Sequence, residues 1–121
     1  GESKEPFGLV VNGAEHAPGL VDYLRTQNID IREVTLEDPR GAVEAGLHDL
    51  ILTVDADYGK RFSSGDVASV TLTYDSSGMG KTRRNAMATR QLIAGYGQQI
   101  GMLRLGVAGS GASNSSSRLW L

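Results

Sequence analysis

The seven residues "HDLILTV", His48 to Val54, decide how the fold of this chain is organised. Their apolar side chains stand on consecutive positions instead of alternating with polar ones. That pattern is typical of a strand whose two faces are both buried, because such a strand meets apolar partners above and below the sheet. We therefore expect residues 48–54 to form a central strand.

The residues before this strand alternate between strand and helix patterns. "FGLVVN" (7–12) predicts a buried strand closed by an Asn-Gly turn, and "IDIREV" (29–34) predicts a half-buried strand. A proline suits the first turn of a helix at 18–26, and Asp38 followed by a proline predicts a short helix that ends at Gly46. Because helices separate these strands, we expect the first three strands to be parallel, joined by right-handed crossovers.

A third helix is predicted directly after the central strand. Asp55 or Asp57 would cap it, Tyr58 and Phe62 lie four residues apart on one face, and Gly65 ends it. The next stretch, "VASVTLTY" (67–74), alternates β-branched and polar residues and predicts a fourth strand.

A long last helix is predicted from Thr82 to Val107. Its apolar residues recur with a period of 3.5, which is the spacing of a helix that packs along another surface. The residues of this seam are Ala86, Ile93, Ile100 and Val107, with Tyr96 and Leu103 between them. Three glycines, at 95, 97 and 101, interrupt the helix and favour close packing against a partner. We expect the first half of the seam to pack within the domain and the part beyond Ile100 to lead towards a membrane.

The predicted fold class is α/β, in the order β-α-β-α-β-α-β-α, with helices covering a small four-stranded sheet. The sheet is expected to be mainly parallel or mixed, since the pattern leaves the direction of the fourth strand open. Residues 7–108 are predicted to form a single domain. A flexible lead-in is expected at residues 1–6, and a flexible tail rich in glycine and serine at 109–121.

Composition narrows the function classes. The chain has 121 residues and no cysteine, which excludes disulfides, thiolate metal sites and thiol nucleophiles. A net charge of −2 argues against nucleic acid as a partner. All 14 acidic residues lie within residues 1–75, whereas residues 76–121 carry six basic residues and no acid. The C-terminal third therefore faces different surroundings or folds back on an acidic domain.

The stretch "YDSSGMGKTRRN" (74–85) raises the alternative of a phosphate-binding loop. In that motif, G-x-x-x-x-G-K-[ST], backbone N–H groups curl around phosphates while the lysine neutralises them. With Gly80, Lys81 and Thr82 as its end, the first glycine should stand at position 75, which is an aspartate. A carboxylate there would point negative charge at the anion, and no acid follows Asp75 to hold magnesium. A nucleotide-binding enzyme is therefore the least favoured interpretation.

Other catalytic or metal sites lack support in the sequence. Asp55 and Asp57 follow the central strand as in a receiver domain, but the first strand ends at Asn12 without an acidic pair for magnesium. No glycine-rich signature supports a flavin site. His16 and His48 do not have the spacing of a metal-binding pair. We expect no catalytic residue, no cofactor and no metal.

A longer stretch carries a family resemblance. It runs "DPRGAVEAGLHDLILTVDADYGKRFSSGDVASVTLTYDSS" (38–77), with an alanine-rich helix, a strand opening on Asp49, an acid and aromatic pair at Asp57 and Tyr58, and a strand closed by Asp75. These features resemble the extracytoplasmic domain of ABC exporter permeases of the second type, especially sodium-extrusion permeases. "FGLVVNGAEHAPGLVDYL" and "QQIGMLRLGVAG" are similar to that family's first strand and helix and to its arm returning to the membrane.

The resemblance implies a non-enzymatic domain on the extracytoplasmic side of a cell-membrane permease, between its first two membrane helices. It would gate, dimerise or contact a partner or substrate, while a separate cytoplasmic subunit hydrolyses ATP. The chain has no apolar run of the about 20 residues that span a bilayer, so we interpret it as an excised domain. The alternative is a soluble α/β ligand-binding or signalling module.

Four basic residues at the start of the last helix are the candidate contact surface: Lys81, Arg83, Arg84 and Arg90. Lipid headgroups or another subunit, including a second copy of the chain, are the partners that such a surface suggests. The alternative is a helix face that contacts only solvent.

Overall fold

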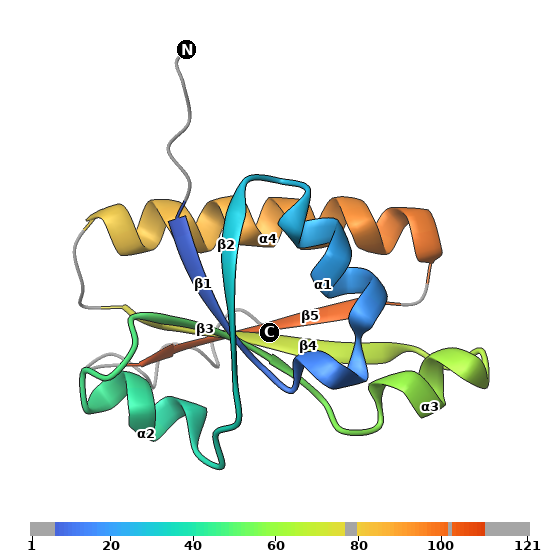
Figure 1. Ribbon diagram of the computed structural model, residues 1–121, viewed down its shortest axis with the longest axis horizontal. Coiled ribbons are helices and arrows are strands. Elements are labelled where there is room, and N and C mark those ends of the chain that lie inside the picture. The colour runs from blue at the N-terminus through green and yellow to red at the C-terminus, as the bar shows by residue number, and fades with distance from the viewer. Residues whose placement is uncertain (1–6, 77–79, 102, 111–121) are drawn as a thin grey trace.

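A computed structural model describes residues 7–76, 80–101 and 103–110, and Figure 1 shows their arrangement around one five-stranded sheet. The strands are ordered β2-β1-β3-β4-β5. Helices α1 and α4 lie over one face of the sheet, and α2 lies on the opposite side. The predicted α/β class is confirmed. The elements are β1 (Phe7–Asn12), η1 (Ala14–His16), α1 (Pro18–Arg25), β2 (Ile29–Val34), α2 (Pro39–Glu44), β3 (Leu50–Val54), α3 (Tyr58–Ser63), β4 (Ala68–Asp75), α4 (Gly80–Ile100) and β5 (Leu103–Ser110).

The three N-terminal strands are parallel, as predicted. β1 pairs in parallel with β2 on one side and with β3 on the other, and β3 is the central strand of the sheet. Leu52 is fully buried in the larger core, under α1 and α4, while Ile51 is fully buried in the smaller core, against α2. Burial on both faces explains the consecutive apolar residues of this strand.

The fourth strand is antiparallel to the third, which settles the direction that the sequence left open. The short helix α3 joins the two strands. Its Tyr58 and Phe62 rings stack 6.2 Å apart, and Gly65 follows the helix with a φ of +79°, both as expected. Asp57 is the N-cap residue of α3, but its side chain makes no capping hydrogen bond.

The prediction for the C-terminal third is wrong in one respect. The last helix ends at Ile100 instead of Val107, and residues 103–110 form a fifth strand parallel to β4. Gly101 takes a φ of +75°, which favours glycine and ends the helix. Leu103 and Val107 fit a period of two as well as a period of 3.5, and the free edge of β4 supplies a backbone hydrogen-bonding partner for the strand.

The first half of the predicted seam packs within the domain, as expected. Ala86 and Ile93 are 2% and 1% exposed and belong to the larger core. Gly97 lies against the returning strand: a Cβ at that position would make ordinary van der Waals contact with Leu103, 3.4 Å from its Cβ. The part beyond Ile100 is a sheet strand and does not continue the helix.

The domain limits expected from the sequence shift slightly at the C-terminal end. β5 continues to Ser110 and so includes the first two residues of the expected tail. The expected flexible segments at 1–6 and 111–121 lie outside the described residues.

Candidate functional site

One end of the sheet gathers several chain segments. Opposite pairs in the register, Leu50 with Tyr74 and Tyr74 with Gly109, place the start of β3 beside the ends of β4 and β5. β1 is parallel to β3 and begins at the same end. Helix α4 begins there too, on the left of Figure 1, whereas α3 lies on the right. We call these two ends of the sheet the basic end and the α3 end.

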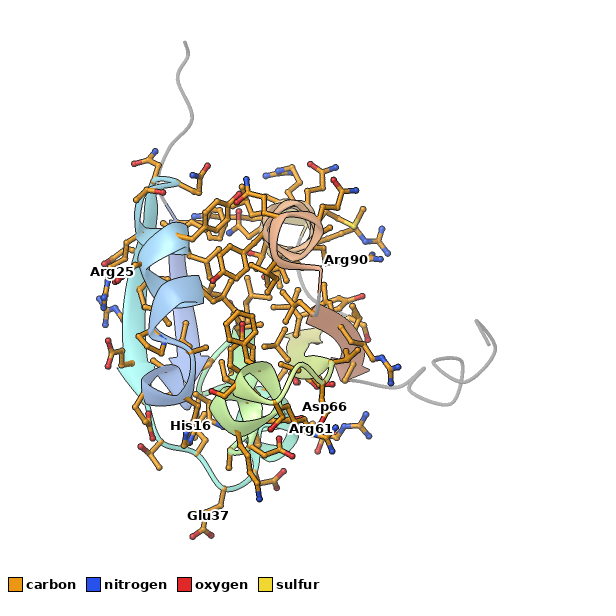
Figure 2. All side chains as sticks on the ribbon, turned by 90° about the vertical axis from the view of Figure 1, so that its right-hand side faces the viewer. His16, Arg25, Glu37, Arg61, Asp66 and Arg90 are labelled. Atoms are coloured by element: carbon orange, nitrogen blue, oxygen red, sulfur yellow. The ribbon has the colours of Figure 1, made fainter. Side chains whose placement is uncertain are left out.

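The basic end carries three of the four predicted contact residues. Lys81, Arg83 and Arg84, which we call the basic cluster, are exposed in the first turn of α4. Arg90 lies six residues after Arg84, about 9 Å further along the helix axis at roughly 1.5 Å per residue. Figure 2 shows Arg90 on the side of α4 that faces away from α1, where its guanidinium lies 3.6 Å from the sulfur of Met87. The structure therefore brings together three of the four cations.

The basic cluster has unfavourable surroundings within its own helix. The first turn of α4 contains no acidic residue, and cations at the positive end of a helix are destabilised by its dipole. Within the described part of the chain, no ion pair involves a member of the cluster. Local helix energetics therefore do not explain these three charges.

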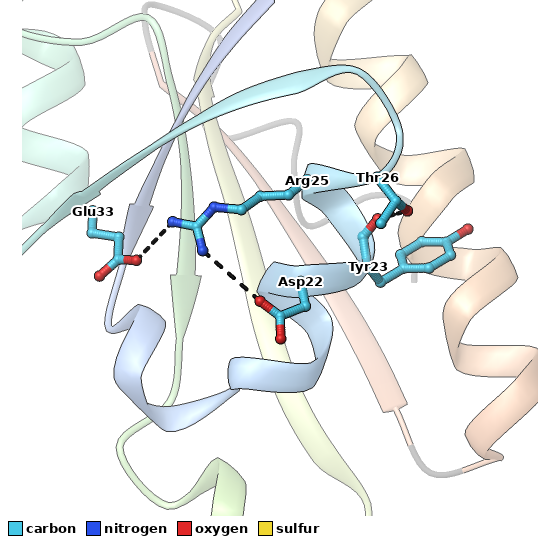
Figure 3. Close-up of polar contacts among 5 residues, drawn as sticks. All are labelled: Asp22, Tyr23, Arg25, Thr26 and Glu33. Carbon is cyan, nitrogen blue, oxygen red and sulfur yellow. Dashed lines mark hydrogen bonds and ion pairs between the residues drawn. The ribbon is translucent and has the colours of Figure 1, made fainter.

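Two other cations of the domain, Arg25 and Arg61, have carboxylate partners. Figure 3 shows Arg25 of α1, whose guanidinium lies 2.9 Å from the carboxylate of Glu33 on β2 and 3.9 Å from that of Asp22. In α3, Nε of Arg61 donates a hydrogen bond of 2.8 Å to Asp57. These pairs tie neighbouring elements or turns together, a role that the basic cluster does not have.

A groove lies beside the basic cluster, with a volume of about 380 Å³. Phe7, Val10 and Leu50 contribute apolar surface to it, and Lys81, His48 and Asp49 contribute charged or titratable groups. The groove joins the starts of β1, β3 and α4, so it depends on the tertiary fold. No sequence pattern indicated this groove.

Leu47, next to the groove, was also missed by the sequence analysis. It follows Gly46, which has a φ of +79°, and the N–H of Leu47 donates to the carbonyl of Ala42 at 3.0 Å. That bond, with the one from Gly46 to Val43, forms a Schellman motif, in which the residue after the glycine commonly packs back on the helix. The Leu47 side chain instead remains 69% exposed.

The phosphate-loop alternative departs further from its motif in the structure. The amide of Asp75 donates a 3.1 Å hydrogen bond to the carbonyl of Asp49, so the backbone at this position belongs to the sheet. A phosphate loop would need the backbone here to turn around an anion. Residues 77–79 of the motif lie outside the described residues.

The α3 end is where the three parallel strands finish, which is the usual position of a ligand site in α/β sheets. The buried Asn12 fills part of it: the side-chain amide donates to the carbonyl of Leu36 at 3.0 Å, and its oxygen accepts from the N–H of Leu36 at 2.8 Å. Gly13 lies so near the end of β3 that a Cβ added to it would be 2.8 Å from the carbonyl oxygen of Val54. These contacts fill the space beside the ends of β1 and β3, while a hollow of about 240 Å³ lies on α3, lined by residues of that helix and its flanks.

Of the aspartates that follow the central strand, Asp57 interacts with a side chain of α3. A hydrogen bond from Arg61 holds the pKa of the Asp57 carboxyl below its ordinary value, and the same pair raises the pKa of Arg61. Figure 2 looks onto this end and shows Arg61 and Asp66 at α3, with His16 nearby. Among the described residues, no group of three or more histidine and acidic side chains is arranged to hold a metal ion.

Comparison with known proteins supports the fold. No family model matches the chain, and no curated protein matches it by sequence. A solved structure, the crystal structure of "a domain of a putative ABC type-2 transporter from Thermotoga maritima MSB8", is similar to the chain with a TM-score of 0.60 and 13% sequence identity. The match covers 96% of this chain and 98% of that one. Within the described residues, no helix has the length and apolar character needed to cross a bilayer. At this level of identity, the likeness establishes a shared fold that extends almost from end to end of both chains.

Proposed function

We propose that this chain is a non-enzymatic extracytoplasmic domain of an ABC type-2 export permease. The observation that carries the proposal is the position of the first and last strands along the chain: β1 begins, and β5 ends, at the same end of the sheet. A domain inserted between two membrane-anchored segments needs this arrangement. The near end-to-end likeness to the Thermotoga maritima transporter domain supports the same conclusion.

In this proposal the domain works with the membrane-embedded remainder of its permease and with a separate cytoplasmic ATPase subunit. Its own part is to gate the transporter or to contact a partner, through the basic cluster and, further along α4, Arg90. A second copy of the chain is one such partner. Sodium is the cargo suggested by the family resemblance, and a sodium-efflux assay on cells lacking the gene tests that part separately.

A ligand-binding module is the second candidate, and the groove of about 380 Å³ favours it. Its mixture of apolar and charged groups resembles small-molecule sites, which combine apolar walls with a few polar groups. A thermal-shift screen of small anions and amino acids distinguishes the two. A stabilising ligand whose effect is lost in Asn85→Leu, a change in the groove lining, would favour the module.

The sidedness of the domain can be tested by cysteine labelling, since the chain has no cysteine of its own. We would express the whole gene product with Lys60→Cys, an exposed position on α3, and treat intact cells with a membrane-impermeant maleimide. Labelling before lysis is expected. Leu52→Cys, at a fully buried position, is the control that should stay unlabelled in the folded protein. Labelling of residue 60 only after permeabilisation would place the domain in the cytoplasm and overturn the proposal.

A further inference from the structure

We propose that the basic end of the domain lies against the surface of the bilayer and binds anionic lipid headgroups. The inference names the partner of the surface described above and rests on the proposed function for its tethering to a membrane. Three features of the basic end carry it: the basic cluster, the exposed Leu47, and the presence of both the start of β1 and the end of β5 at this end of the sheet.

The charges of the basic cluster fit an anionic surface. Lys81, Arg83 and Arg84 are exposed within one helical turn and have no ion-pair partner among the described residues. A cation close to an anionic bilayer strengthens association by roughly fivefold, which corresponds to about 1 kcal/mol. An extended anionic surface can engage all three cations at once.

Leu47 supplies an apolar contact at the same end of the sheet. It directly precedes His48, which lines the groove together with Lys81. Its 69% exposure is unusual for the residue after the glycine of a Schellman motif. An apolar side chain beside exposed cations is the combination that binds the boundary between headgroups and acyl chains.

Two acidic residues at the basic end oppose the attraction to an anionic bilayer, so removing one of their charges should strengthen it. Asp49 lines the groove and is exposed, and Asp75 ends β4 at the same end of the sheet. Replacing Asp49 with asparagine removes one negative charge near the cluster. The change should therefore strengthen docking on an anionic bilayer.

The position of the chain ends makes such docking geometrically simple. If β1 and β5 lead to membrane-anchored segments, the basic end is the part of the domain held nearest to the bilayer. Tethering raises the effective concentration of the surface, so that weak individual contacts suffice. The α3 end, at the opposite end of the sheet, would face away from the membrane.

The test uses the chain anchored to vesicles through a C-terminal histidine tag and a nickel-chelating lipid at fixed density. A fluorophore on Ala45→Cys, an exposed position at the end of α2, reports proximity to a quencher-labelled lipid while leaving Leu47 intact. Vesicles contain either phosphatidylglycerol mixed with phosphatidylcholine or phosphatidylcholine alone. We expect strong quenching on the anionic vesicles, weak quenching on the neutral ones, and loss of the difference in high salt.

Substitutions assign the effect to the proposed surface. Changing the three residues of the basic cluster to glutamine should lower the docking constant by roughly 100-fold, and Leu47→Ser should lower it while leaving the salt dependence. Asp49→Asn should raise it. The charge-matched control changes three exposed arginines elsewhere, Arg32, Arg40 and Arg104, to glutamine and should retain the quenching.

Equal quenching on both kinds of vesicle, or quenching that survives in the basic-cluster variant, would overturn the inference. The inference would also be overturned if the basic-cluster variant lost a co-purifying protein while its docking on lipid stayed unchanged. The surface would then bind a protein instead of a bilayer. If the vesicle experiment fails while residue 60 is still labelled in intact cells, lipid docking is refuted and the proposed function stands. Lipid docking with cytoplasmic labelling refutes the proposed sidedness alone.

Discussion

The two ends of the sheet differ in how their polar groups are used. At the α3 end, Asn12 is hydrogen bonded to the backbone of Leu36, and Arg61 is paired with Asp57. At the basic end, three cations stand in one helical turn without an ion pair among the described residues, and Leu47 is largely exposed. At the usual ligand end of an α/β sheet, these groups are therefore engaged within the domain, whereas the three cations and Leu47 at the other end are exposed and available to a partner.

The largest effect is expected at Gly13, on the α3 end. Gly13→Ala should lower the free energy of unfolding by about 3 kcal/mol. The reason is twofold: the residue has a φ of +84°, and the new Cβ would lie 2.8 Å from the carbonyl oxygen of Val54. Urea denaturation followed by circular dichroism measures the change.

Gly46→Ala is the matched control for this substitution. Gly46 has a φ of +79°, but a Cβ there would meet no atom within 4 Å. It should cost only the conformational term, about 1 kcal/mol. Equal losses at the two glycines would contradict the close approach of backbones at the α3 end.

Asn12→Ala should have the next largest effect. The substitution leaves both the N–H and the carbonyl of Leu36 without their side-chain partner, and a loss of about 2 kcal/mol is expected. Asn85→Ala, in the groove at the basic end, should change stability by less than about 0.5 kcal/mol. If the asparagine in the groove proved the costlier one to replace, the contrast between the two ends would be wrong.

Changing the basic cluster to glutamine should have a smaller effect of opposite sign. Because cations oppose the dipole at the start of a helix, stability should rise by about 1 kcal/mol in low salt. High salt should remove most of the gain. Paired thermal melts at two ionic strengths check this, and a destabilised variant would show that the cluster has a structural role.

The smallest effect concerns the pH dependence at Asp57. Its pKa is lowered by the hydrogen bond from Arg61, so the pair stabilises the fold above the ordinary carboxyl range and loses that contribution as the pH falls through the lowered pKa. In Asp57→Asn, this part of the acid-side loss should disappear. Stability against pH between 5 and about 2 measures it, and an unchanged acid limb would show that the exposed pair contributes nothing.

Local sequence signals predicted the N-terminal two thirds of the fold well. The buried run at residues 50–54, the Asp38 cap, which accepts a hydrogen bond from Gly41 at 3.0 Å, and the glycine stops depend on neighbouring residues alone. The fifth strand could not be predicted in this way. Leu103 and Val107 fit both periods, and the choice depends on the edge of β4, which is distant in sequence.

The closeness of the candidate contact residues could be predicted in part for the same reason, while their role as a contact surface stays a prediction. The basic cluster is contiguous in sequence, so its three members were found together. Arg90 shares the helix but lies almost two turns beyond the last member of the cluster. The groove and the exposure of Leu47 depend on how the starts of three elements meet, and no sequence pattern encodes that.

The most direct test of the account places a spin label at residue 45 or residue 60 of the full-length gene product in native membranes. Relaxation by oxygen, which partitions into lipid, is compared with relaxation by an aqueous nickel complex. We predict a strong oxygen preference at residue 45 that falls when the basic cluster is changed to glutamine, and an aqueous environment at residue 60. Equal aqueous exposure at both positions, with or without the basic cluster, would contradict the claim that the basic end faces the bilayer.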